Sequence, residues 1–180
     1  MSKQLIYRKI ITTPLGNMIA CAIEDGICFL DFADRKDFDK LFSIMINYLD
    51  GELIDDIEDK ESSKAGKLIL ILEKELDEYF LGKRKEFSLP LFTIGTEFQK
   101  KVWDELLNIP YGTTISYKEE AKNLNKEKAF RAVANANGKN KLSIIIPCHR
   151  VIASGGELGG YGGGLGKKEF LISLEKNNIQ

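Results

Sequence analysis

A cysteine, a histidine and an arginine stand side by side at Cys148-His149-Arg150, directly after Pro147. A free thiol with a pKa of about 8.5 is mostly protonated at neutral pH, and a neighbouring base or cation raises its thiolate fraction. These residues therefore supply a nucleophile, a base and a positive potential within one turn of chain. Adjacent side chains need not face one another, so the pattern predicts a reactive cysteine only if the fold turns His149 toward Cys148.

Two further segments have both a structural and a functional interpretation. The stretch 125–137 is rich in alanine around Arg131, which is typical of a closely packed helix. It is also typical of a slim surface that enters a nucleic-acid groove with one arginine as a wedge, and the residues alone favour the packed helix. The glycines of 159–164 indicate either a flexible loop or a backbone that approaches a ligand closely. This segment lacks the spacing of a phosphate-binding loop.

Composition limits the function classes. With 43% hydrophobic and 29% charged residues in 180, the chain has the make-up of a soluble globular protein. No apolar run is long enough to span a membrane, and the N-terminus has no secretion signal, so we expect a cytoplasmic protein. Cys21 and Cys28 are then reduced and read as small core residues. One histidine and three cysteines are too few for a zinc site in addition to this chemistry, so we expect no metal.

The charge is unevenly distributed between the two halves. Residues 1–90 contain 13 basic and 18 acidic side chains, a balance of −5, whereas residues 91–180 contain 13 and 9, a balance of +4. A basic half favours a polyanionic partner. We place the domain boundary near Leu89, with an N-terminal α/β domain over 1–89 and a C-terminal domain over 90–180.

The first half has the pattern of a small sheet with helices. Asp25-Gly26 between apolar runs predicts a hairpin that pairs Ile23 with Cys28 and Cys21 with Leu30. One face of the sheet would then hold Ile19, Cys21, Ile23, Cys28, Leu30 and Phe32. The acidic stretch 50–61 reads as an exposed loop or a weak strand edge. A helix is predicted from Ser63 to Leu81, stopped by Gly82, with an inward face of Leu68, Leu72, Leu76 and Tyr79 or Phe80.

The second half predicts a helix-turn-helix. Thr96 caps a helix to Asn108, and the box Ser116–Glu119 opens a short helix to Leu124. Asn125 is expected to cap a third helix that ends at Gly138. The apolar run 143–146 is predicted to be a buried strand. A glycine-rich loop over 155–166 then precedes a last helix that contains Phe170, Leu171 and Leu174.

Taken together, these segments resemble the O6-alkylguanine-DNA alkyltransferase family over about residues 79–175. The segments that carry the resemblance are Ile109-Pro110-x-Gly112-x-Thr114-x-Ser116-Tyr117, Arg131-Ala132-Val133, Asn140, Ile146-Pro147-Cys148-His149-Arg150-Val151, Gly160-Tyr161-x-Gly163-Gly164-Leu165 and Lys168-Glu169. The resemblance implies an α/β fold: a ribonuclease H-like sheet-plus-helix domain followed by a winged helix-turn-helix-like domain.

The resemblance also implies direct, single-turnover DNA repair. Cys148 would accept the alkyl group from O6-alkylguanine in double-stranded DNA, and O4-alkylthymine is a second candidate substrate. His149, through a water, would be the base of Cys148, and Glu175 would orient His149. Asn140 would brace the turn below Cys148, and Tyr117 would crowd the target phosphate and donate a proton to the departing guanine. The protein would act as a monomer and would need no cofactor.

DNA contacts follow from the same resemblance. Because O6 lies within the stacked duplex, the damaged nucleotide must be flipped out, at a cost of a few kcal/mol. Arg131 would fill the space that it leaves. The remaining residues expected to contact DNA or the base are Ala132, Tyr117, Val151, Ser154, Tyr161, Gly162 and Gly163.

The chain departs from the usual family pattern at three positions. Lys141 stands where proline is usual, which is expected to loosen the turn below Cys148. Gly162 replaces a serine or alanine, and Phe170 replaces a tryptophan. Two alternatives stay open: a protein that binds alkyl lesions without chemistry, and a helix-turn-helix regulator that uses Cys148 as a sensor.

Overall fold

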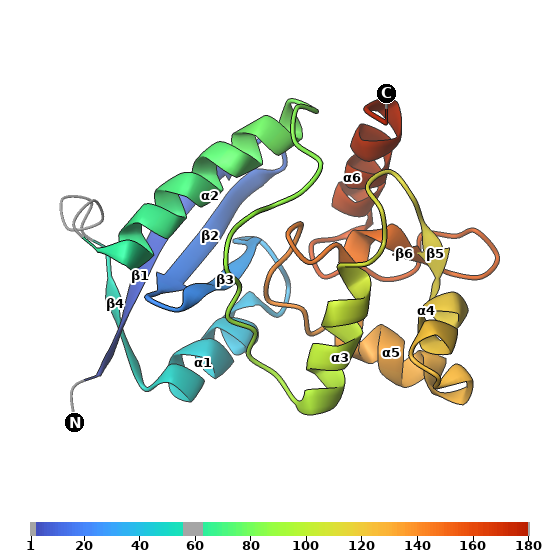
Figure 1. Cartoon of the computed structure of the whole chain (residues 1–180), viewed down its shortest axis with the longest axis horizontal. Coiled ribbons are helices and arrows are strands. Elements are labelled where there is room, and N and C mark those ends of the chain that lie inside the picture. The colour runs from blue at the N-terminus through green and yellow to red at the C-terminus, as the bar shows by residue number, and fades with distance from the viewer. Residues whose placement is uncertain (1–2, 56–62, 180) are drawn as a thin grey trace. The chain divides into compact units, whose positions relative to one another are not determined.

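A computed structural model describes residues 3–55 and 63–179. The chain divides into two compact units, residues 1–94 and 95–180 (Figure 1). The strip 90–94 belongs with the first unit, since it runs beside the start of β3 (Gly26–Phe32). The amide of Ile27 donates to the carbonyl of Pro90 at 2.9 Å, and the amide of Phe92 donates to the carbonyl of Ile27 at 2.8 Å.

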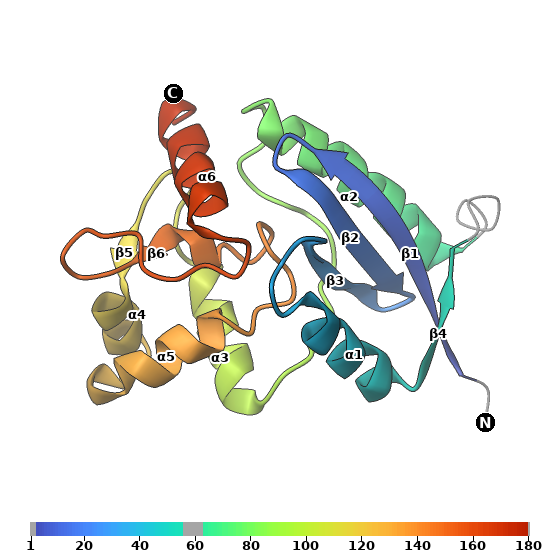
Figure 2. The same cartoon turned by 180° about the vertical axis from the view of Figure 1, so that it is seen from behind.

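The first unit is built on a four-stranded sheet in the order β3-β2-β1-β4 (Figure 2). The strands β1 (Gln4–Thr13) and β2 (Gly16–Ile23) are antiparallel, as are β2 and β3. The edge strand β4 (Gly51–Ile54) runs parallel to β1. The stretch 50–61 thus contributes a sheet edge at its start, and its residues 56–61 lie outside the described part of the chain.

The predicted hairpin is present, but its predicted register is wrong. The strands meet at Ile23 and Gly26, so the turn is Glu24-Asp25. A bulge between Cys21 and Ala22 then pairs Cys21 with Phe29, whereas Ala20 pairs with Leu30. Because directly paired residues share a face, Leu30 lies opposite the face of Cys21. The periodicity could not reveal this, since every residue of β3 is buried and no polar face marks the register.

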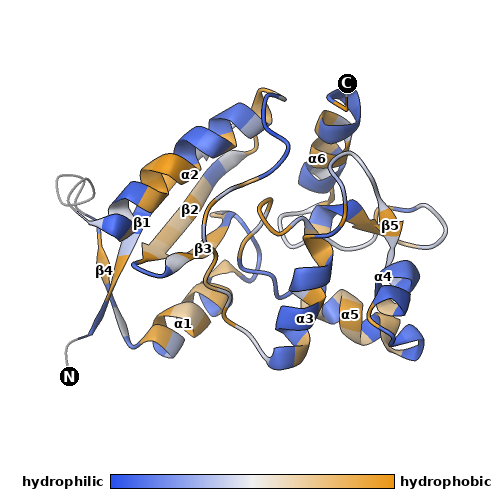
Figure 3. Cartoon of the chain, viewed as in Figure 1, coloured by the Kyte–Doolittle hydropathy of each residue, from blue (hydrophilic) through white to orange (hydrophobic). Residues whose placement is uncertain are grey.

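Helices cover both faces of this sheet. Helix α1 (Phe38–Leu49) packs on the face that holds Ile6, Cys21 and Phe29, through Leu41 and Met45. Helix α2 (Lys64–Phe80) packs on β1, β2 and β3, and its Glu73 forms an ion pair with Lys9 of β1. Figure 3 shows hydrophobic residues along β2 and β3 and an alternation of hydrophobic and hydrophilic residues along α2.

The expected limits of α2 are confirmed. Ser63 accepts a hydrogen bond from the amide of Gly66 at 2.9 Å, and Gly82 follows the helix with a φ of 70°. The buried face includes Leu68, Leu72, Leu76 and Tyr79. Cys21 and Cys28 are buried and unpaired to each other, as expected of small core residues.

The second unit is mainly helical. Its elements are α3 (Glu97–Leu106), β5 (Ile115–Ser116), α4 (Tyr117–Asn123), η1 (Glu127–Ala129), α5 (Phe130–Asn137), η2 (Cys148–Arg150), β6 (Val151–Ile152) and α6 (Leu165–Asn177). Both predicted N-terminal caps are confirmed, because Thr96 with Gln99 and Ser116 with Glu119 form reciprocal capping boxes. The pair α4 and α5 forms the helix-turn-helix. None of the helices within residues 3–55 and 63–179 is long and apolar enough to cross a membrane.

Two predicted elements of this unit are wrong. Asn125 does not cap a third helix. With a φ of 55° it ends α4, where the amides of Asn125 and Lys126 donate back to Lys122 and Ala121, and a short 3-10 helix precedes α5. The run 143–146 is buried but forms turns instead of a strand, with Ile144 at a φ of 72°. The predicted burial of this run is confirmed, but a short apolar run cannot distinguish a strand from a buried turn.

Candidate active site

Short elements bring Cys148 close to Tyr117. Cys148 begins the 3-10 helix η2, which leads into β6, and β5 leads into α4, which begins at Tyr117. The two strands pair in parallel, Ile115 with Val151 and Ser116 with Ile152. This ladder places the start of α4 beside the chain that leaves Cys148, although 30 residues separate the two in sequence. Tyr117 is half-buried and Cys148 is buried.

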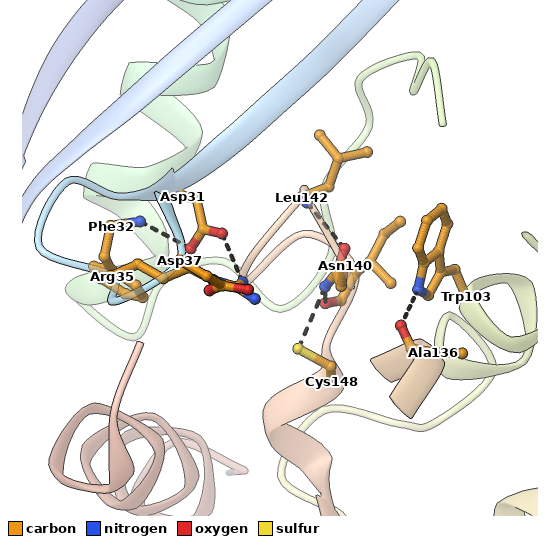
Figure 4. Close-up of polar contacts among 10 residues, drawn as sticks. Asp31, Phe32, Arg35, Asp37, Trp103, Ala136, Asn140, Leu142 and Cys148 are labelled. Carbon is orange, nitrogen blue, oxygen red and sulfur yellow. Dashed lines mark hydrogen bonds and ion pairs between the residues drawn. The ribbon is translucent and has the colours of Figure 1, made fainter. Parts of the chain in front are cut away.

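Asn140 organises the turn below Cys148 (Figure 4). Its Nδ2 donates to the carbonyl of Ile146 at 2.9 Å and to Sγ of Cys148 at 3.3 Å. Its Oδ1 accepts from the amide of Leu142 at 2.9 Å. The side chain thus holds both ends of the turn 142–146 and gives the sulfur a hydrogen-bond donor, which favours a thiolate over a thiol.

Lys141 directly precedes the turn 142–146. The side chain is buried, and Nζ lies 5.5 Å from the ring centroid of Trp103 (Figure 4 shows Trp103). The indole Nε1 of Trp103 in turn donates to the carbonyl of Ala136 at 2.9 Å. A buried lysine stem and a cation–π contact therefore connect the start of the turn to Trp103.

His149 and Glu175 form a buried pair. Nε2 of His149 lies 2.7 Å from Oε1 of Glu175, on α6. Burial opposes the negative charge of Glu175, but hydrogen bonds and positive charge from His149 and Arg150 outweigh it and lower its pKa to about 2. Since Glu175 is ionised, Nε2 is the protonated nitrogen that donates to it. In the neutral ring, Nδ1 is then the atom that can accept a proton.

The environment of His149 favours its neutral form. Burial lowers its pKa, Glu175 raises it, and the positive charges of Arg150 and Lys168 lower it further. Nδ1 is buried and makes no hydrogen bond to any residue in the described part of the chain. His149 directly follows Cys148 in sequence, and its neutral imidazole keeps an unused acceptor atom, as a general base requires.

Arg150 binds Glu175 from the other side. Its Nε donates to Oε2 at 2.9 Å and its Nη2 to Oε1 at 3.1 Å, a bidentate arrangement. Its Nη1 donates to the carbonyl of Ile109 at 2.6 Å, and the amide of Gly112 donates to Glu175 at 3.0 Å. Glu175 thereby connects η2, α6 and the turn after α3. Sequence reasoning had treated Arg150 only as a source of positive potential.

Lys168 is a site residue that sequence reasoning missed. The side chain is fully buried, and Nζ donates to the carbonyls of Val151 at 2.5 Å and Gly160 at 3.1 Å. It also lies 5.7 Å from the ring centroid of Tyr117. Burial lowers the pKa of Lys168 to about 8, and the negative charge of a Cys148 thiolate opposes that shift. The presence of Lys168 in the family motif was the signal that could have drawn attention to it.

The same cluster fixes Tyr117. Its hydroxyl donates to the carbonyl of Gly160 at 3.3 Å. Burial raises its pKa to about 12, and negative charge on Cys148 and Glu120 adds to the shift. The phenol is therefore protonated at neutral pH and has a proton to donate.

Of the residues predicted to contact DNA, Tyr117 and Val151 belong to this cluster through their contacts with Lys168, and the others are exposed or half-buried. Arg131 and Ala132 are exposed on α5, and the guanidinium of Arg131 lies 5.8 Å from the ring centroid of Phe130. Ser154 is exposed in the loop after β6, and residues 161–163 are half-buried before α6. Phe170 is 41% exposed on α6. Within the described ranges, no three His, Cys, Asp or Glu side chains are placed to share a metal ion.

Both halves of the chain match a family model. Residues 97–177 match the 6-O-methylguanine DNA methyltransferase DNA binding domain, and residues 6–93 match the ribonuclease-like domain of the same family. These two models together cover most of the chain.

Known proteins resemble the chain over its full length. The methylated-DNA–protein-cysteine methyltransferase of Methanosarcina barkeri is 41% identical over 175 residues, which cover 97% of this chain and 100% of the relative. The constitutive enzyme of that name from Bacillus subtilis is 39% identical over 172 residues, which cover 94% of this chain and 95% of the relative. Mycobacterium tuberculosis OGT, solved in complex with DNA, superposes with a TM-score of 0.78 at 33% identity, over 97% of this chain and 94% of that one.

Proposed function

The chain belongs to the 6-O-methylguanine DNA methyltransferase family, and we propose that Cys148 accepts the alkyl group in its direct repair of DNA. The lesion is O6-alkylguanine in double-stranded DNA, and the alkyl group moves irreversibly to the sulfur. The observation that supports this most is the placement of Cys148. Its sulfur accepts a hydrogen bond from Asn140 at 3.3 Å, and the residue that follows it, His149, forms a buried pair with Glu175.

Four residues, Cys148, His149, Glu175 and Tyr117, account for every proton and bond of the proposed transfer. Nδ1 of His149 takes the thiol proton of Cys148 through a bridging water, and Glu175 stabilises the resulting imidazolium. The thiolate attacks the alkyl carbon, so a sulfur–carbon bond forms as the carbon–O6 bond breaks. Guanine leaves with the electron pair of that bond and is neutralised by a proton from Tyr117. The product is a thioether, for which there is no leaving step, so each molecule acts once and needs no cofactor.

DNA binding requires a second set of residues. The nucleotide flips out of the duplex, and Arg131 with Ala132 on α5 enters the groove and fills the gap. Backbone groups of Val151, Tyr161, Gly162 and Gly163, with Ser154, then line the flipped base. The asymmetric charge supports this assignment, since residues 91–180 have a balance of +4. We further propose that the protein works as a monomer in the cytoplasm, and light scattering in solution tests the first part.

Intact-protein mass spectrometry tests the reaction. After incubation with a duplex that contains O6-methylguanine, the wild-type chain should gain the mass of one methyl group, and peptide mapping should place it on Cys148. Cys148→Ala should gain none, whereas Cys21→Ala, which removes a buried thiol of the sheet, should behave as wild type.

The two alternatives predict other outcomes. An unmodified wild-type chain that still binds the lesion would indicate a binding protein without chemistry. A sequence-specific footprint on undamaged DNA would indicate a regulator. We expect instead weak, salt-sensitive binding to undamaged DNA without sequence preference.

A further inference from the structure

A second buried acid, Glu120, lies in the helix-turn-helix. It belongs to α4, one turn after Tyr117, and its side chain is fully buried. Nδ2 of Asn137, the last residue of α5, donates to its Oε2 at 2.7 Å. The reaction proposed above uses neither residue.

One atom of each side chain has no hydrogen-bond partner in the described part of the chain. These atoms are Oε1 of Glu120 and Oδ1 of Asn137, and both are buried. Two acceptors cannot satisfy each other, and a buried polar group left without a partner destabilises the fold. A carboxylic acid removes the conflict, since its O–H on Oε1 can donate to Oδ1 while Oε2 still accepts from Nδ2.

The charges around Glu120 also disfavour a carboxylate. From α3, Glu105 adds negative charge, and from α5 the contact is the neutral amide of Asn137. On its own helix Tyr117 is the titratable group that interacts with it, and Lys118, Glu119 and Lys122 are exposed. The strands β5 and β6 contain no titratable residue, and Arg131 of α5 and Glu127 and Lys128 of η1 are exposed. Burial raises the pKa of Glu120 to about 8, the hydrogen bond from Asn137 lowers it, and the charge of Glu105 raises it.

We propose that Glu120 is held as a neutral carboxylic acid and forms a two-hydrogen-bond pair with Asn137 that fastens α4 to α5. The proton stays on Oε1 and is shared with Oδ1 of Asn137. The pair connects the helix that begins with Tyr117 to the helix that ends three residues before Asn140. Glu120 is thus a positioning residue for both ends of the site, and this second part rests on the proposed function of Tyr117 and Asn140.

The pair has a defined pH dependence. A carboxyl group whose pKa is higher in the folded than in the unfolded chain stabilises the fold less as pH rises from about 4.3, the unfolded value, to the folded value. Between about pH 5 and 8, the folding equilibrium constant of the wild type should therefore fall about tenfold per pH unit relative to Glu120→Gln. Glutamine has the same shape and can donate and accept the same two bonds without a proton to lose.

Urea unfolding of wild type and Glu120→Gln from pH 5 to 8 measures this difference. Glu127→Gln is the matched control, since Glu127 is exposed in η1, and it should run parallel to wild type. If wild type and Glu120→Gln also run parallel, Glu120 is an ordinary carboxylate and the proposal fails.

A measurement on the wild-type protein avoids dependence on variants. The carbon-13 shift of the Glu120 carboxyl should titrate with a midpoint near pH 8, whereas a midpoint near 4.5 overturns the proposal. As a second variant, Glu120→Leu with Asn137→Leu replaces both partners with apolar groups. It should be more stable than either single change, because each single change leaves one polar group alone.

The transfer rate tests the positioning role separately. Above pH 8 the wild-type rate should decline more steeply than that of Glu120→Gln, because ionised Glu120 breaks one bond of the pair close to Tyr117. Lys168 titrates in the same range, so the difference between the two proteins is the quantity to compare. Parallel rate profiles with divergent stability profiles would retain the pair and refute its link to the site. A protein without transfer activity would refute the proposed function and leave the stability result standing.

Discussion

Gly159 lies against the ring of Tyr117. A Cβ atom at Gly159 would lie 3.0 Å from Cε2 and 3.2 Å from the hydroxyl oxygen, and the backbone there has a φ of 69°. A glycine is needed both for the backbone angle and for this close approach. The ring of Tyr117 is thereby held between the glycine-rich loop and Lys168.

Gly159→Ala should slow alkyl transfer by about tenfold or more, because the new methyl group displaces the Tyr117 ring. An increase of about 1.4 kcal/mol in the activation free energy already slows a reaction tenfold. Gly156→Ala is the matched control. Its φ is also positive, at 93°, but nothing lies within 4 Å of its Cβ position. Both variants should lose about 1 kcal/mol of stability, and only Gly159→Ala should lose rate. Equal rates in single-turnover assays would show that the contact with Tyr117 is unimportant.

Asn140→Ala should reduce the reactivity of Cys148. The change removes the donor to Sγ and both bonds that close the turn 142–146, so the thiolate loses a stabilising partner. We expect alkylation by iodoacetamide at neutral pH and transfer from DNA both to slow, by about tenfold or more. Asn135→Ala, an exposed amide on α5, serves as the control. If the alkylation rate is unchanged, the hydrogen bond does not activate the sulfur.

Glu175→Gln should destabilise the fold in a pH-dependent way. Its folded pKa, about 2, is below its unfolded value of about 4.3, so its contribution is complete above pH 4.3 and is lost as pH falls toward 2. At pH 7 the loss should be roughly 3 kcal/mol, since the change leaves Arg150 buried without its carboxylate. Denaturant unfolding should show that the difference in unfolding free energy between wild type and Glu175→Gln becomes smaller between pH 5 and 3. A difference that does not change with pH would mean that the pairing of the Glu175 carboxylate with His149 and Arg150 does not stabilise the fold.

Lys141→Ala should cost about 1 kcal/mol of stability. It removes the contact with Trp103 and the buried stem of the lysine side chain. Tryptophan fluorescence follows this directly, because Trp103 is the only tryptophan. Lys101 is an exposed lysine on α3, the helix that contains Trp103, and Lys101→Ala should leave both the stability and the tryptophan emission unchanged. The cation–π interpretation is refuted if the two variants cannot be told apart.

Arg131→Ala should slow transfer from duplex DNA more than it weakens binding. The duplex must hold its damaged nucleotide outside the stack, whereas a free O6-alkylguanine base needs no extrusion. Transfer from the free base should therefore be unaffected. Lys128→Ala removes an exposed cation of η1, and we expect it to weaken binding slightly without changing the rate of transfer. Normal repair by Arg131→Ala would remove the wedge from the mechanism.

Local signals in the sequence determined several elements. The capping boxes at Thr96 and Ser116 and the glycine after α2 act within one helical turn, so they could be read directly from the spacing of residue types. The reactive segment around Cys148 was recognisable for the same reason, since its signature is contiguous. Asn125 was misassigned because asparagine is favoured both before a helix and in the left-handed position after one.

Only the tertiary structure decided how these segments meet. Packing between distant residues determines the bulge at Cys21, the turns over 143–146 and the pairing of β5 with β6. The periodicity of a short segment contains no information on such packing. The same holds for the contact of Glu175 with His149 and for Lys168 beside Tyr117. Residue types established which chemistry was available, and the burial and direction of the side chains, which are long-range properties, decided which atoms can perform it.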